Sequence, residues 1–230
     1  ARGTGSDPAH DPAPNDADGW NALGVALAAS RELERAEAAF RRALAALPLH
    51  VPALCGLCDV LHQSQRGDEA IALAERGTRE LADDPSVWFK LGHLRMLDGE
   101  LAPARVAFAR SAALLPGYAP THQNLGLIDE WTCRLDAAEH DYRTALALAP
   151  DSVDARFGLA TVLLKQRKAE EGWRLYARGR TPAGAAAHRI PARPWRGETL
   201  PGTLLVDTDQ GLGDVLQFIR FASIARRRVW

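Results

Sequence analysis

The chain has 230 residues, of which 47% are hydrophobic and 25% charged, and its formal net charge is −1. These values are ordinary for a soluble globular protein and exclude the strongly basic surface that binds nucleic acid or an anionic membrane. No run approaches the ~18 uninterrupted apolar residues that cross a bilayer, so we expect no membrane partner. Three cysteines without an export signal predict reduced thiols and a cytoplasmic location.

Residues 1–16 precede the first aromatic residue, Trp20, and are rich in Pro, Asp, Gly and Ala. A segment of this composition cannot bury enough apolar surface to fold, so we expect a disordered tail. It also lacks the apolar stretch of a signal peptide.

Residues 17–178 contain an internal repeat, because a shift of 34 residues aligns the same residue types in units that start near 17, 51, 85, 119 and 153. One column holds leucine: Leu23, Leu57, Leu91, Leu125 and Leu159. The next column is small: Gly24, Cys58, Gly92, Gly126 and Ala160. A later column is mostly aromatic: Phe40, Ala74, Phe108, Tyr142 and Tyr176. Several columns at one spacing are strong evidence for a repeat.

Each unit predicts two helices of about 12–14 residues, since apolar residues recur three and four positions apart. Small residues are needed where antiparallel helices cross at roughly 8 Å. These columns resemble the tetratricopeptide repeat (TPR). The resemblance implies an all-α, right-handed solenoid of about five helix pairs, whose inner groove commonly binds a peptide or a partner protein.

The repeat register predicts which side chains line that groove, since one face of each first helix points inward. The predicted groove residues are Phe89, Lys90, His93, Gln123, Asn124, Leu127, Trp131 and Phe157. The aromatic ones suit the anchoring of an extended peptide. Packing between neighbouring units is an equally good interpretation of Phe89, Trp131 and Phe157. The oligomeric state is left open.

The sequence gives little reason to expect a metal site. Cys55 and Cys58 match half of a redox or zinc motif, but no second pair exists and Cys58 falls in the small-residue column. The histidines show no ligand spacing. We therefore interpret these residues as packing or surface positions.

After the repeats the pattern changes. Residues 179–202 are rich in Pro and Gly and predict a linker. Residues 203–208 are apolar and β-branched and predict a buried strand, and residues 215–228 have helical spacing. The turn between them contains Gln210, Gly211, Leu212, Gly213 and Asp214. Residues 203–230 therefore predict a short, incomplete α/β segment, whose turn either approaches a ligand or caps the helix.

Residues 170–221 resemble the junction in bacterial TPR-linked glycosyltransferase-like proteins, which continue into a GT-B domain related to O-GlcNAc transferases and heptosyltransferases. The matching residues are Trp195, Gly197, Glu198, Leu200, Gly202, Asp209 to Asp214, and Leu216 to Phe218. The resemblance implies that Asp214 is the catalytic base, that Gln210, Gly211, Leu212 and Gly213 form the substrate loop, and that a full-length parent uses a nucleotide sugar. Only one strand–helix unit of that domain is present, so the domain is truncated and this chain itself needs no cofactor.

Two functions follow as expectations. The first is a peptide- or protein-binding scaffold without catalytic activity. The alternative is the N-terminal fragment of a glycosyltransferase that acts on a protein or glycan acceptor, so the parent's enzymatic status stays open.

Overall fold

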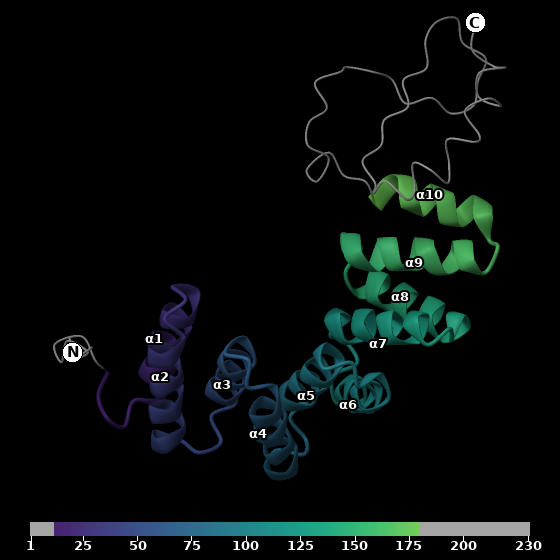
Figure 1. Cartoon of the computed structure of the whole chain (residues 1–230). Helices are drawn as coiled ribbons and strands as arrows, with labels where there is room; N and C mark the ends of the chain where they lie inside the picture. Colours follow the sequence, from purple (N-terminus) through teal and green to yellow (C-terminus); the bar gives the residue numbers. More distant parts are fainter. Residues whose placement is uncertain (1–11, 180–230) are drawn as a thin grey trace, which may run out of the picture. The chain divides into compact units, whose positions relative to one another are not determined.

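The computed structural model describes residues 12–179. Within these residues it contains ten α-helices and no strand (Figure 1). In chain order the helices are α1 (Ala17–Ala29), α2 (Leu33–Ala46), α3 (Val51–Gln63), α4 (Gly67–Glu80), α5 (Pro85–Leu97), α6 (Leu101–Leu114), α7 (Ala119–Trp131), α8 (Leu135–Leu148), α9 (Val153–Lys165) and α10 (Ala169–Gly179). They pair as five units, each made of an odd-numbered first helix and an even-numbered second helix. None of the described helices is long and apolar enough to cross a membrane.

The expected α/β segment requires a correction. The described chain is an all-α solenoid, and residues 203–230, including Gln210 to Asp214, lie outside the described residues. The prediction of a strand at residues 203–208 rests on residue types alone. A strand needs partners, and no described segment supplies one.

Four of the first helices, α1, α3, α5 and α9, begin at a residue whose side chain accepts a hydrogen bond from a free backbone N–H. The Asp16 carboxylate accepts a hydrogen bond from the Gly19 amide at 2.8 Å and so caps α1, and Asp84 caps α5 in the same way. Each turn between the two helices of a unit contains one residue with positive φ: Arg31, Gln65, Gly99, Cys133 and Arg167. These residues lie at the same register, so one backbone turn is repeated with four different residue types.

Aromatic rings pack against glycines within and between units. A Cβ atom on Gly24 would lie 2.7 Å from the Phe40 ring, and one on Gly56, in the next unit, would lie 2.5 Å from it. Tyr142 fits in the same way between Gly126 and Gly158. A buried ring held between two first helices therefore joins unit one to unit two and unit four to unit five.

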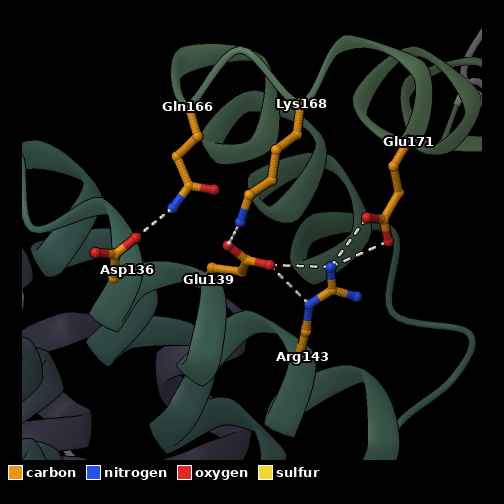
Figure 2. Close-up of polar contacts among 6 residues, drawn as sticks. All are labelled: Asp136, Glu139, Arg143, Gln166, Lys168 and Glu171. Atoms are coloured by element: carbon orange, nitrogen blue, oxygen red, sulfur yellow. Dashed lines mark hydrogen bonds and ion pairs between the residues drawn. The ribbon is translucent and has the colours of Figure 1, made fainter.

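Ion pairs also join neighbouring units, and two of them run from the first turns of a second helix to the next unit. Glu37 on α2 pairs with Arg66 at 2.8 Å, and Glu139 on α8 pairs with Lys168 at 2.6 Å. Figure 2 shows the latter pair, together with Arg143, which donates to both Glu139 and Glu171. At the Glu37 register α6 carries a cation instead, Arg105.

Arg105 donates from Nε and an Nη atom to both carboxylate oxygens of Asp129 at 2.7 and 3.2 Å. Arg134 contacts the same carboxylate at 2.7 Å. Asp129 is fully buried, so its charge depends on these two guanidinium groups. At the junction between units three and four, therefore, the second helix supplies the cation and the next unit supplies the carboxylate. This is the reverse of the pairs that Glu37 and Glu139 make.

Candidate functional site

The predicted groove residues lie on three first helices, α5, α7 and α9. Some neighbouring first helices contact one another directly: α1 contacts α3, α3 contacts α5, and α7 contacts α9. We call the surface formed by α1, α3, α5, α7 and α9 the first-helix face. Its side chains divide into those that hold neighbouring helices together and those that remain exposed.

Phe89 belongs to the packed group. Its ring lies 5.4 Å from the ring of Phe108 in its own unit and 5.4 Å from that of Tyr118, which precedes α7. Both contacts are edge-to-face, the geometry that aromatic pairs favour. Phe89 therefore fills the space between units three and four.

The polar residues on α5 are also engaged. The Lys90 ammonium donates to the Asp59 carboxylate on α3 at 2.6 Å. His93, one turn further on, is half-buried, and this burial lowers its pKa, with a smaller contribution from the positive charge of Lys90. Lys90 thus joins α3 to α5, whereas His93 is partly covered and makes no hydrogen bond to another described residue.

On α7, two predicted residues support the neighbouring unit. The Ser152 hydroxyl, which also caps α9, donates to the Gln123 amide oxygen at 3.2 Å. Leu127 is partly buried and packs against the cluster that contains Tyr142.

Three predicted residues remain available for a ligand. Trp131, at the end of α7, is 55% exposed, and Phe157 on α9 is 45% exposed although its ring lies 5.4 Å from that of Tyr176. The Asn124 amide makes no hydrogen bond to another described residue. Leu97 on α5, which the sequence reasoning missed, has the same register as Trp131 and is also exposed.

Glu130, next to Trp131, is a second residue that the sequence reasoning missed. Its carboxylate accepts hydrogen bonds from the Tyr142 hydroxyl at 3.2 Å, from Thr161 at 2.9 Å and from Lys165 at 2.8 Å. Burial raises the pKa of Tyr142, and the neighbouring negative charge of Glu130 adds to the effect. The sequence feature that could have indicated this network is the spacing of Glu130 and Lys165, which lie one repeat plus one residue apart. These hydrogen bonds hold the end of α7, where Trp131 lies, against the neighbouring helices.

The described residues contain no group of three or more His, Cys, Asp or Glu side chains placed to hold a metal ion. Cys58 is buried, and its thiol lies 3.6 Å from the Ala70 carbonyl oxygen. Burial raises the pKa of Cys55 to about 11 and that of Cys58 to about 12, which keeps both thiols protonated. Asp214 and the predicted substrate loop lie outside the described residues.

Comparison with known proteins agrees with this arrangement. A family model described as tetratricopeptide repeat matches residues 11–92, and a second model with the same description matches residues 134–187. The chain is similar to Protein FlbA of Caulobacter vibrioides, with 29% identity over 179 residues, which is 75% of this chain and 30% of FlbA. The chain thus spans less than a third of the length of this curated relative.

Solved structures share the fold. PilF of Pseudomonas aeruginosa superposes with a TM-score of 0.68 at 18% identity, over 92% of this chain and 85% of PilF. YrrB, described as a TPR protein with an unusual peptide-binding site, superposes with a TM-score of 0.57 at 19% identity, over 72% of this chain and 85% of YrrB. These identities show a common fold alone. The matched models concern the repeats and give no support to a glycosyltransferase-like domain.

Proposed function

Because the described helices are tetratricopeptide repeats, we propose that the chain is a scaffold that binds an extended peptide or protein segment on its first-helix face. The observation that carries the proposal is the 55% exposure of Trp131 at the end of α7. Large aromatic side chains are frequent energetic centres of protein interfaces.

The surroundings of Trp131 suit such a ligand. Leu97 offers a second apolar contact one repeat away, and Phe157 offers a third on the next unit, nearer the start of its helix. The Asn124 amide can donate to and accept from a peptide backbone, because it has no partner among the described residues. A segment with spaced apolar side chains therefore fits this face better than a strongly charged one.

Two further considerations support the proposal. YrrB, which shares the fold, is described as having a peptide-binding site. The three cysteines are free, which is consistent with a reducing, cytoplasmic setting.

The test starts from selection of unstructured peptides against the full chain by display of a random library. Affinities of the selected peptides are then measured by fluorescence polarisation for the wild type, for Trp131→Ala and for the control Trp173→Ala, which removes another exposed tryptophan. Loss of a central anchor costs about 2 kcal/mol, so we expect Trp131→Ala to weaken binding about 30-fold while the control stays near the wild type. Equal losses in both variants, or none in either, would contradict the proposal.

A further inference from the structure

A side chain at one position of the repeat holds the loop that precedes the first helix of its own unit. In units one, three and five this side chain donates a hydrogen bond to a backbone carbonyl oxygen six or seven residues upstream. The donors are the indoles of Trp20 and Trp88 and the guanidinium of Arg156, at 2.9, 2.8 and 2.7 Å from the oxygens of Ala13, Ala82 and Pro150. Indole and guanidinium groups keep their protons near neutral pH, so these links do not titrate there. Leu54 has this register in unit two and carries no donor.

Unit four places a histidine, His122, at the same register. Its Nε2 atom lies 3.0 Å from the carbonyl oxygen of Pro116, six residues upstream. A carbonyl oxygen accepts hydrogen bonds and cannot donate them, so Nε2 completes the link only when it carries a proton. Among the links in the described units, the one in unit four therefore depends on a titratable donor.

The other ring nitrogen of His122 also faces an acceptor. Its Nδ1 atom lies 3.3 Å from a carboxylate oxygen of Asp141 on α8, and both side chains are only 14% exposed. A neutral imidazole has a single N–H, which can serve one of these two acceptors but not both. Both contacts form together only when the pair holds one further proton, either on the imidazole or on the carboxyl group.

His50, at the junction between units one and two, shows the opposite arrangement. Its Nδ1 atom accepts a hydrogen bond from the Ala53 amide at 3.2 Å, and its Nε2 atom lies 2.9 Å from a carboxylate oxygen of Asp18. One neutral tautomer, with the proton on Nε2, satisfies both contacts. The need for a further proton is therefore specific to the surroundings of His122 and does not follow from the burial of a histidine.

We propose that the His122–Asp141 pair is a pH-sensitive link between units three and four, which holds the Pro116 carbonyl while the pair carries its extra proton and releases it when that proton passes to water. A carboxylate is a stronger acceptor than a carbonyl oxygen, so the single N–H that remains serves Asp141. The released loop also carries Tyr118, whose ring lies 5.4 Å from that of Phe89 in unit three. The link thus acts on the junction itself and does not depend on a ligand of the first-helix face.

The charged groups around the pair come from α6, α7 and α8. Burial raises the pKa of Asp141, and the negative charge of Asp129 on α7 adds to this effect, whereas the hydrogen bond and charge of His122 and the charge of His140 oppose it. Arg105 on α6 also interacts with the Asp141 charge. A carboxyl group whose pKa is raised by folding stabilises the fold below its unfolded pKa, and this stabilisation is lost as the pH rises through the folded pKa. Asp141 thus responds in the same direction as the link.

The test is amide hydrogen exchange of the full chain, followed by mass spectrometry at pH 5.5 and pH 8.5. These conditions lie on either side of about 6.5, the pKa of a histidine in an unfolded chain. After correction for the intrinsic pH dependence of exchange, protection of residues 114–118 should fall about fivefold at the higher pH, the effect of one lost hydrogen bond. Residues 148–152, which Arg156 holds in unit five, are the internal control and should keep their protection.

Three variants separate the link from other effects of pH. His122→Arg installs the residue that unit five has at this register, and its permanent donor should abolish the fall. Asp141→Asn should abolish it as well, because the amide N–H donates to Nδ1 and leaves the Nε2 proton for Pro116. His140→Gln removes the neighbouring exposed histidine and should leave the fall unchanged. Circular dichroism checks that each variant keeps its helix content.

Three results would overturn the proposal. The first is equal protection of residues 114–118 at both pH values in the wild type. The second is a fall of the same size in His122→Arg or Asp141→Asn, since neither variant needs the extra proton. The third is an equal fall in residues 148–152, which would assign the effect to the whole stack of units and not to this junction.

Discussion

Gly158→Ala tests the packing that joins units four and five. A Cβ on Gly158 would lie 2.3 Å from Cζ and 2.7 Å from the hydroxyl oxygen of Tyr142. The ring cannot move away freely, because it is buried and Gly126 lies on its other side, where a Cβ would be 3.0 Å from it. A shift of the ring would also disturb its hydrogen bond to Glu130.

Three contributions determine whether Gly158→Ala lowers or raises the free energy of unfolding. Overpacking a core costs about 1–3 kcal/mol, and a lost hydrogen bond adds about 1 kcal/mol. Alanine is about 1 kcal/mol better than glycine inside a helix, which offsets part of this cost. We therefore expect Gly158→Ala to lower the free energy of unfolding by about 1–3 kcal/mol, which corresponds to roughly 2–4 °C in melting temperature per kcal/mol for a chain of this size.

The assay is urea unfolding followed by circular dichroism at 222 nm, with Gly67→Ala as the matched control. A Cβ on Gly67 meets no atom within 4 Å, so that variant should be as stable as the wild type or slightly more stable. If Gly158→Ala were equally well tolerated, the ring of Tyr142 would not be held between the two glycines, and this account of the unit interface would be wrong.

Two further predictions concern titratable groups. The hydrogen bond from Lys168 holds the pKa of Glu139 below its usual value of 4.5, so the stability it contributes is present above that pH and is lost as the pH falls through the lower, folded-state pKa. Glu139→Gln should flatten the fall of the urea midpoint in this acidic range, and an unchanged slope would refute the assignment. At about pH 8, Cys133, which is exposed, should react quickly with a disulfide reagent, while Cys55 and Cys58 react slowly because burial raises their pKa values to about 11 and about 12. Cys133→Ser should remove the fast phase, and a persisting fast phase would show that the buried pair is accessible.

The repeat could be predicted from the sequence because the 34-residue register is recorded in residue types that packing requires. The glycines and the aromatic residues need each other: Gly24 and Gly56 leave the space that Phe40 fills. The TPR repeats are therefore confirmed by the family models and by the solved structures. The expected α/β segment was wrong as a description of the fold, because a short apolar run specifies a strand only when neighbouring strands exist to pair with it.

The roles of individual site residues could not be predicted, because residues at one register meet different neighbours. Phe89 and Phe157 are equivalent in the repeat, yet Phe89 is covered by Tyr118 whereas Phe157 remains 45% exposed. Likewise the contact between Lys90 and Asp59 depends on two side chains from different units. The exposure of a side chain depends on the neighbouring units, so the sequence of one unit does not predict it.

The charges at the junctions between units also depend on the order of the units. Loss of unit four would bring Arg105 against Lys168 and replace the buried Asp129 by Leu163, which has the same register. Two cations would then face each other with no carboxylate between them. The charges at these junctions therefore fit the order of units in this chain and oppose the loss of unit four.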